Sequence, residues 1–182
     1  MCGTKSCAIL GHSPMRFAWG FDEKAAESHD MKMELAQQIM VLRQQGATHF
    51  SVACDCGVGL YAAEVINVLR DNDPELMLFC VTPYEEQATK WTPELRERYF
   101  DMLVKCSHMT AVYTHKQPDA QLKAYRTIIR QSDMVLAVYD PASARGADTD
   151  AAIQYARELK RPILSIHPDT LRTSCLTEFE FM

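Results

Sequence analysis

The sequence lacks the features that would place it in a nucleic-acid or membrane class. Its 19 Lys and Arg residues are outnumbered by 24 Asp and Glu residues, for a net charge of -5, and no dense basic run offsets this balance locally. Proteins that neutralise a nucleic-acid backbone carry a basic surface, so we do not expect nucleic acid as the partner. No apolar run approaches the roughly 20 residues that span a bilayer, and no basic and apolar leader starts the chain. We expect a cytoplasmic protein that does not enter a membrane.

Paired cysteine motifs are missing as well. The 7 cysteines form an odd set without C-x-x-C spacing. Several fall inside expected strands or helices, which favours free buried thiols. Cys54 and Cys56 lie two positions apart, but no neighbouring histidine supplies a third ligand. We therefore expect no metal, and the sequence leaves any other cofactor unknown.

Internal repeats, low-complexity tracts and long Pro/Gly/Ser linkers do not divide the 182 residues. We therefore expect one domain over residues 1–167, followed by a tail over residues 168–182. The tail mixes apolar and acidic residues without a clear period. Three fates stay open for it: packing on the domain, joining a neighbouring subunit, or fraying.

Apolar runs typical of buried strands alternate with helical patterns. The expected strands are 7–10, 50–53, 76–81, 109–113, 134–139 and 163–166, and the expected helices are 30–45, 60–69, 93–106, 121–131 and 149–160. Asp30 and Thr92 fit as helix N-caps, and Gly46 fits as a C-terminal stop. Apolar strands joined by helix-length crossovers predict a parallel sheet covered on both faces. The expected fold class is α/β, a Rossmann-like three-layer sandwich with a mostly parallel sheet and helices on both faces.

A glycine turn between residues 50 and 69 is the first candidate site. The apolar run ends at Cys-Asp-Cys-Gly-Val-Gly, and an apolar stripe at helical spacing follows at once. Gly57 and Gly59 permit a tight turn that leaves N–H groups unpaired at the positive end of a helix dipole, where phosphate or another anion binds. Glycines after a strand also occur in tight turns that bind nothing. The accompanying residues therefore decide between an anion site and a plain turn.

Other candidates follow the remaining strands, because open parallel sheets bind ligands beyond the carboxyl ends of their strands. These residues offer aromatic rings for a base, cations for phosphate and a carboxylate for a ribose hydroxyl. With the glycine turn and Glu64 of the next helix, the candidate ligand-binding residues are Gly11, His12, Ser13, Pro14, Arg16, Trp19, Gly57, Gly59, Glu64, Pro83, Tyr84, Gln87, Trp91, Asp140, Gly146 and Thr149.

Several of these residues have a plain structural alternative. Trp19 and Trp91 would equally cover the edge of the core. His12 fits a hydrogen-bonded loop histidine better than a catalytic one unless a carboxylate accompanies it. Glu64 on its helix is either partly exposed or reaches the ligand cleft. Asp148 at a helix start disfavours a phosphate there, which leaves sugar or base for the last loop.

Short motifs in a fixed order extend these candidates along nearly the whole chain. They are Gly11-His12-Ser13-Pro14, Trp19-Gly20, Gly57-Val58 with Ala62-Ala63-Glu64, Pro83-Tyr84 with Gln87 and Trp91, Lys123 with Arg126, Ser132-Asp133, Tyr139-Asp140, and Thr149 with Tyr155-Ala156. Together they resemble the YpsA-like branch of the SLOG superfamily, which includes the DNA-processing protein A family and the LOG (lysine-decarboxylase-like) phosphoribohydrolases. The resemblance implies a Rossmann-like fold and a nucleotide or nucleotide-derived ligand, implies no reaction, and adds Arg126 to the candidate ligand-binding residues.

Two functions compete on these residues. The first is binding or sensing of a nucleotide or nucleotide-derived small molecule at the C-terminal edge of the parallel sheet, which needs no catalytic group. The alternative is a hydrolase of an N-glycosidic or phosphate bond in such a ligand. Glu64 or Asp140 would then be the general base, and Arg16 or Arg126 would hold phosphate.

Two further readings are weaker. The phosphoribohydrolases carry Gly-Thr-x-x-Glu in the last loop, whereas the third residue after Thr149 is Ala152, which cannot act as an acid or base. Single-stranded DNA binding needs a basic groove with aromatic rings, and the acidic balance argues against it. A homo-oligomer stays open, because Leu95, Met102 and Leu103 would serve an interface or the core equally well.

Overall fold

The computed structural model describes residues 5–142 and 147–176. Its elements in chain order are β1 (Lys5–Gly11), η1 (Pro14–Arg16), α1 (Ala26–Gln44), β2 (Ala47–Val52), α2 (Val58–Arg70), β3 (Met77–Tyr84), η2 (Gln87–Lys90), α3 (Pro93–Lys105), β4 (His108–Tyr113), α4 (Ala120–Arg130), β5 (Met134–Val138), α5 (Asp148–Glu158), β6 (Ile163–Ile166) and β7 (Thr173–Cys175). Within this part of the chain, no helix has both the length and the apolar character that crossing a membrane requires.

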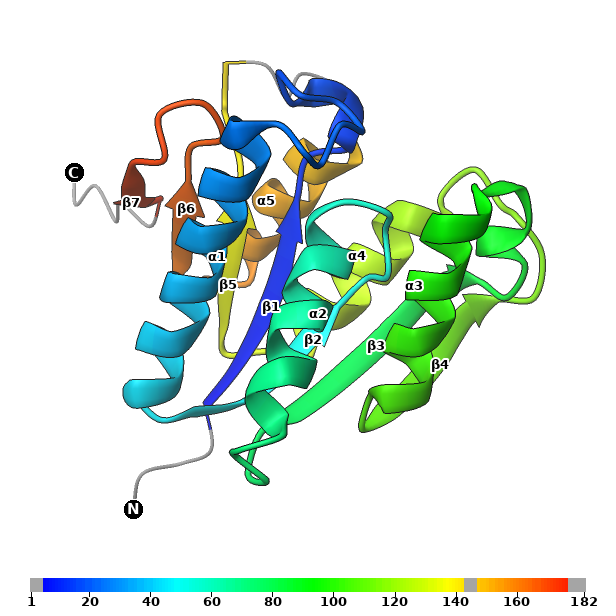
Figure 1. Ribbon diagram of the computed structural model, residues 1–182. Coiled ribbons are helices and arrows are strands. Elements are labelled where there is room, and N and C mark those ends of the chain that lie inside the picture. Colours follow the sequence, from blue (N-terminus) through cyan, green and yellow to red (C-terminus); the bar gives the residue numbers. More distant parts are fainter. Residues whose placement is uncertain (1–4, 143–146, 177–182) are drawn as a thin grey trace.

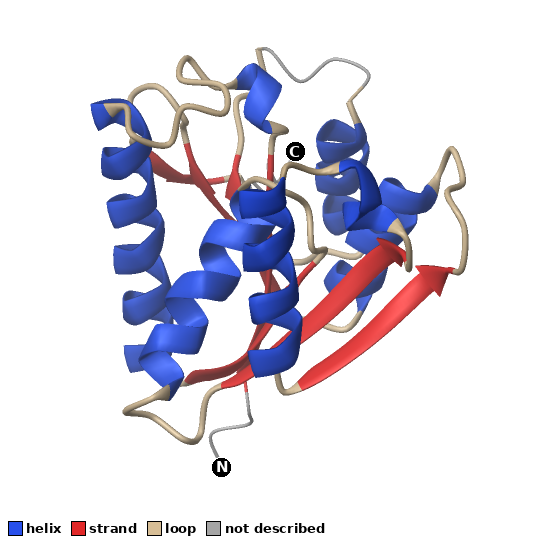
Figure 2. Ribbon diagram, turned by 45° about the vertical axis from the view of Figure 1, so that its right-hand side comes forward, coloured by secondary structure: helices blue, strands red, loops and turns tan. Residues whose placement is uncertain are grey.

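One seven-stranded sheet with the order β4-β3-β2-β1-β5-β6-β7 forms the middle layer. Neighbouring strands pair in parallel from β4 to β6, and β7 pairs antiparallel with β6. Helices α1, α2 and α3 cover one face, and α4 and α5 cover the other (Figure 1). The strands lie between these two groups of helices (Figure 2). The expected α/β, Rossmann-like fold is confirmed.

Strand β1 shows why the sequence folds into three layers. Cys7 and Ile9 belong to the core beneath α1–α3, whereas Ala8 and Leu10 belong to the core beneath α4 and α5. All four side chains are fully buried. Successive side chains of a strand point to opposite faces, so an apolar run without alternation requires cover on both sides of the sheet.

Helix α1 begins one turn earlier than expected. It starts at Ala26 with Ala25 as N-cap, and the expected cap Asp30 lies inside the helix. The buried stripe of Met31 and Leu35 continues backwards to Ser28, which is also buried. The sequence pattern missed this turn because a small polar residue occupies the buried position. The other two end signals are confirmed: Thr92 Oγ1 accepts the N–H of Leu95 at 3.4 Å, and Gly46 follows α1 with a φ of 100°.

The described part of the tail, residues 168–176, packs on the domain. After the loop that follows β6, Thr173–Cys175 forms the edge strand β7, and Leu176 donates its N–H to the carbonyl of Ile163. A strand of three exposed residues is too short to show a period, which is why the sequence pattern did not reveal it. Residues 177–182 lie outside the described part.

Helix α3 uses its apolar face for the core. Met102 is buried, and Leu95 and Leu103 are partly buried against the same cluster. These three residues therefore do not form an exposed interface. Phe100 and Val104 are the apolar residues that α3 exposes.

Candidate functional site

The candidate site is a cavity at the point where the order of the strands in the sheet reverses. Strands β2, β3 and β4 follow one another on one side of β1, and β5 and β6 lie on its other side. The loops after β1 and β5 therefore diverge, which opens a crevice at the carboxyl ends of the strands. A cavity of about 680 Å³ occupies this edge and is lined from the segments after β1, β2, β3 and β4 and from the start of α5. This volume fits a small organic ligand.

Many of the residues proposed from the sequence meet in this cavity. Those that line it are His12, Ser13, Pro14, Arg16, Pro83, Tyr84, Gln87, Trp91 and Thr149. The rings of Tyr84 and Trp91 are half-buried, and Trp91 meets Tyr99 edge-on with ring centroids 5.1 Å apart. The position at the carboxyl edge brings together segments that are far apart in the chain.

The glycine turn differs from the expectation in its hydrogen bonds. Asp55 Oδ1 accepts the N–H of Gly57 at 2.9 Å and the N–H of Gly59 at 3.2 Å. The expectation that these turn amides are unpaired is therefore wrong, because a carboxylate of the chain itself takes the place of an external anion. A Cβ on Gly59 would lie 2.7 Å from Asp55 Oδ2, so the missing side chain makes room for this carboxylate.

Asp55 lines the cavity, and burial and hydrogen bonding have opposite effects on its pKa. Burial raises the pKa of Asp55 above its usual range, and the amides of Gly57 and Gly59 oppose this rise by bonding the charged form. A second anion at the turn would face this carboxyl group at close range. The turn is therefore poorly suited to phosphate as it stands.

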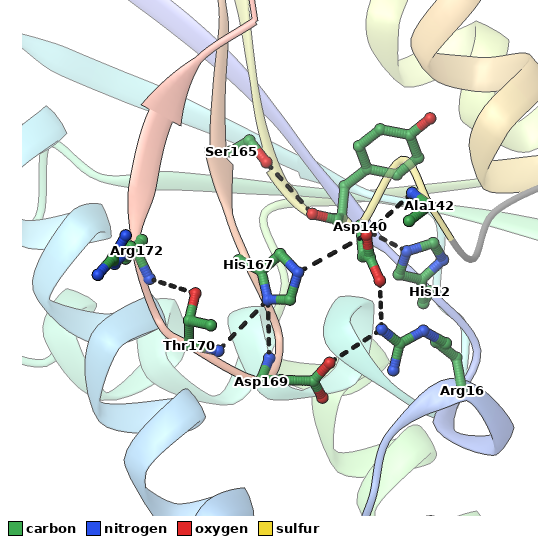
Figure 3. A network of polar contacts seen from close by, with 10 residues as sticks. His12, Arg16, Asp140, Ala142, Ser165, His167, Asp169, Thr170 and Arg172 are labelled. Atoms are coloured by element: carbon green, nitrogen blue, oxygen red, sulfur yellow. Dashed lines mark hydrogen bonds and ion pairs between the residues drawn. The ribbon is translucent and has the colours of Figure 1, made fainter.

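His12 joins the loop after β1 to the loop after β5 (Figure 3). Its Nε2 accepts the backbone N–H of Asp140 at 2.8 Å, and its ring stacks on Tyr139 with centroids 5.3 Å apart. Since Nε2 accepts, the neutral ring carries its proton on Nδ1. Burial lowers the pKa of His12, and the nearby charge of Arg16 lowers it further. His12 is thus a structural acceptor on the cavity wall.

This arrangement makes stability depend on pH through His12. An unfolded histidine titrates near pH 6.5, and the folded one has a lower pKa. The stabilising contribution is present above about pH 6.5 and is lost as the pH falls through the lowered folded value. We expect His12→Gln, which retains an acceptor, to reduce the slope of unfolding free energy against pH just below about pH 6.5.

Urea denaturation at a series of pH values measures this slope. The exposed residue His115 supplies the matched control variant His115→Gln. An unchanged slope in the His12 variant would contradict the assigned role.

Arg16 is held by carboxylates beside His12. Its Nη2 lies 2.5 Å from Asp140 Oδ2 and 3.0 Å from Asp169 Oδ2 (Figure 3). The hydrogen bonds that Arg16 donates to Asp169 and Asp140 raise its pKa. Asp140, His167 and Asp169 place ligand atoms within 4.8 Å of one another, a spacing that a metal ion accepts. The guanidinium already bonds both carboxylates, so we assign no metal to this cluster.

Gly11 is not a lining residue, but its carbonyl group holds two residues of the cavity wall. Its carbonyl accepts the hydroxyl of Thr149 at 3.0 Å and the hydroxyl of Tyr125 at 3.4 Å. Tyr125, whose position favoured core packing, is buried and also lines the cavity. The end of β1 thus fixes two residues of the wall.

Three other proposed residues do not line the cavity. Trp19 is buried in the core and stacks on Phe17 with centroids 4.7 Å apart. Arg126 is exposed on α4, with its guanidinium 5.4 Å from the ring centroid of Tyr155. Asp140 is not part of the described lining either, and its carboxylate bonds Arg16. Gly146 lies outside the described residues.

Glu64 also belongs elsewhere. Its Oε1 and Oε2 accept hydrogen bonds from Arg98 Nε and Nη2 at 2.7 and 2.8 Å. Arg98 also bonds Glu23, which precedes α1. The carboxylate therefore joins α2 to α3. Of the two alternatives that the sequence left open for Glu64, the structure has the partly exposed side chain and not the reach into the cleft.

Sequence reasoning missed several lining residues, among them Asp55, Lys116 and Gln121. An aspartate two residues before a glycine is a signal for a side chain that accepts amides of its own turn. Lys116 and Gln121 follow β4, so the carboxyl-edge rule would have found them had it been applied to that strand too.

The fold and the cavity together define a Rossmann-like protein with a cavity at the carboxyl edge of its sheet. The family model YpsA, described as the YspA SLOG family, matches residues 7–171. The chain belongs to this family.

Relatives match this chain in sequence over different lengths. A UPF0398 protein from Bacillus pumilus is 27% identical over 185 residues, which cover 97% of this chain and 95% of that protein. A UPF0398 protein from Halalkalibacterium halodurans is 32% identical over 114 residues, which cover 60% of this chain and 59% of that protein. This match spans less than two thirds of the H. halodurans protein.

A solved structure of DNA processing protein A from Helicobacter pylori has a TM-score of 0.57 to this chain at 13% identity. The match covers 88% of this chain and 64% of that one. At this identity the likeness shows the fold. That structure is described with a single-stranded DNA binding mode of the H. pylori protein.

Proposed function

We propose that the protein binds or senses a nucleotide or nucleotide-derived small molecule in the cavity at the carboxyl edge of the sheet. The observation that carries this proposal is the composition of the wall. It combines the half-buried rings of Tyr84 and Trp91 with the carboxamides of Gln87 and Gln121. Aromatic faces hold a planar base, and a few convergent polar groups fix its orientation.

The proposal contains no reaction. The hydrolase alternative requires a free carboxylate at the cavity, and the two candidates are engaged elsewhere. Glu64 pairs with Arg98, and Asp140 pairs with Arg16. Neither belongs to the lining that the described residues form. A general base must come within hydrogen-bond reach of its substrate, and neither proposed base does so. The carboxylates that do line the cavity are Asp55, which bonds the amides of the glycine turn, and Asp148 at the start of α5. Binding is therefore the function that we favour.

Single-stranded DNA is a less suitable occupant. Such a ligand is held by a basic groove that follows its backbone. The described lining contains Arg16 and Lys116, but also Asp55 and Asp148. These charges balance rather than attract a polyanion. A homo-oligomer remains part of the proposal without an assigned interface.

A thermal-shift panel of nucleotides and nucleosides tests the proposal. At a concentration of about 100 times Kd, a true ligand should raise Tm by roughly 5–10 °C. We expect Gln121→Ala to weaken binding about tenfold by removing one buried hydrogen bond. Gln37→Ala, at an exposed site on α1, is the matched control and should bind like the wild type.

A mass-spectrometric survey of co-purifying small molecules complements the panel. The proposal fails if no nucleotide-like compound travels with the protein and no member of the panel raises Tm. Retention on single-stranded DNA at physiological salt, with no small-molecule shift, would favour the nucleic-acid reading instead.

A further inference from the structure

Three buried polar atoms of the cavity wall have no hydrogen-bond partner among the described residues. They are Gln87 Oε1, Asp55 Oδ2 and Gln121 Nε2, and the last of these lies near the hydroxyl of Tyr125 without the geometry of a full hydrogen bond. Gln87 is only 9% exposed. Buried polar atoms in folded proteins are almost always hydrogen-bonded, and an unmet bond costs about 1–3 kcal/mol. The three atoms are shielded from solvent as the side chains stand, so a ligand reaches them only after these side chains rotate, and it then gains affinity at each of them.

The three atoms specify a pattern of donors and acceptors. Oδ2 of an ionised Asp55 and Oε1 of Gln87 accept, whereas Nε2 of Gln121 donates. They come from three separate segments: the turn after β2, the helix η2 after β3, and the start of α4. A complementary ligand offers two donors and one acceptor. Ribose hydroxyls and the edges of nucleobases offer such groups, whereas a fully ionised phosphate offers acceptors only.

The charges at the glycine turn also argue against a phosphate there. Asp55 Oδ1 already occupies the amides of Gly57 and Gly59, which are the groups that would hold a phosphate. Arg16 lines the cavity but is bonded to Asp140 and Asp169. The other cation of the described lining is Lys116, which comes from the loop after β4 and not from the turn. A phosphate at the turn would therefore have to replace or face the carboxylate of Asp55.

We propose that the glycine turn receives the nucleoside part of the ligand: a ribose hydroxyl or base N–H donates to Asp55 Oδ2, and no phosphate sits at Gly57 and Gly59. This inference rests on the proposed function and deepens it. Gln87 and Gln121 complete the recognition of the same nucleoside. Any phosphate group of the ligand lies away from the turn.

Asp55→Asn separates the two orientations of the ligand. Asn keeps Oδ1 as an acceptor for the turn amides but presents an NH2 donor in place of Oδ2. A donor of the nucleoside then loses its acceptor, so the nucleoside and its 5′-monophosphate should both bind about tenfold more weakly. A phosphate at the turn would instead lose a repulsive neighbour, so the monophosphate alone should bind more tightly.

Calorimetry with the full-length protein measures these affinities. The probes are adenosine, guanosine, cytidine and uridine, each with its 5′-monophosphate, and the control is Asp71→Asn at an exposed site after α2. For each nucleoside that binds, we expect the nucleoside and its 5′-monophosphate to lose affinity by a similar factor in Asp55→Asn. We expect no change of affinity in the control. Tighter monophosphate binding, or an unchanged nucleoside affinity, would overturn the inference while leaving the proposed function intact.

Competition by inorganic phosphate on the wild-type protein gives a second readout that needs no variant. Millimolar phosphate should not displace the nucleoside if the turn is occupied as proposed. Displacement overturns the inference even where Asp55→Asn fails to fold. If no nucleoside or nucleotide binds the wild type at all, the proposed function itself fails.

Discussion

Adding one methyl group at Gly11 is expected to destabilise the fold by about 3 kcal/mol, at the upper end of the usual cost of overpacking. A Cβ at this position would lie 2.5 Å from Val58 Cγ2 and 3.0 Å from the carbonyl oxygen of Val138. Neither neighbour moves freely, because Val58 starts α2 inside the core and Val138 belongs to the adjacent strand β5. Urea denaturation of Gly11→Ala measures the loss.

The same substitution should weaken ligand binding as well. Thr149 and Tyr125 both donate to the carbonyl of Gly11, so a shift of this residue moves two parts of the cavity wall. A double-mutant cycle with Val58→Ala supplies the control. Removing Cγ2 relieves the closer of the two contacts, so Gly11→Ala should cost clearly less in that background. Equal costs in the two backgrounds would show that the clash with Val58 is not the cause.

Loss of Arg98 should destabilise the protein by about 2 kcal/mol without weakening ligand binding. Its guanidinium bonds Glu64 on α2 and Glu23 before α1, and its own side chain is 24% exposed. Removing one partner of a fully buried pair costs about 3–5 kcal/mol, and partial exposure reduces this figure. Arg98→Gln would leave two carboxylates facing each other across the helix junction.

The pH dependence of this loss has a defined sign. Burial alone would raise the pKa of Glu23, but hydrogen bonds from Arg98 and Lys32 outweigh it and lower the pKa. The stabilisation is therefore present above the unfolded pKa and is lost as the pH falls through the lowered folded value. The difference in unfolding free energy between the wild type and Arg98→Gln should shrink in acid.

A second substitution tests the cause. Glu23 keeps its ion pair with Lys32 in Arg98→Gln, whereas Glu64 loses the partner that Arg98 supplied. Glu64→Gln added to Arg98→Gln removes this carboxylate charge and should recover part of the stability. Chemical denaturation and the nucleotide panel are run on both variants. If Arg98→Gln keeps its fold but loses ligand binding, the result would show that Glu64 and Arg98 do belong to the ligand site.

The layered fold was predictable because burial leaves a direct trace in the chain. Apolar runs without alternation require cover on both faces, and helix-length crossovers require parallel strands. Errors arose where a buried position carries an untypical residue or where an element is very short. Ser28 hid the first turn of α1, and β7 has only 3 residues.

The site was less predictable because its residues come from segments far apart in the chain. The carboxyl-edge rule found His12, Gln87 and Thr149, which meet in the cavity. It could not show that Trp19 packs into the core or that Glu64 pairs with Arg98. Such choices depend on which partner lies nearest in three dimensions.

The amino-acid sequence by itself determined the order of strands and helices, the two-sided burial of the sheet and the edge that carries the cavity, because these follow from local patterns. The tertiary structure alone decided which hydrogen-bonding groups remain available at that edge. Asp55 satisfies the amides of the glycine turn, whereas the amides of the Gln87 and Gln121 side chains each keep an unpartnered atom in the wall. Hydrogen bonds form over about 3 Å and depend on direction, so their partners are settled only when all the layers are packed.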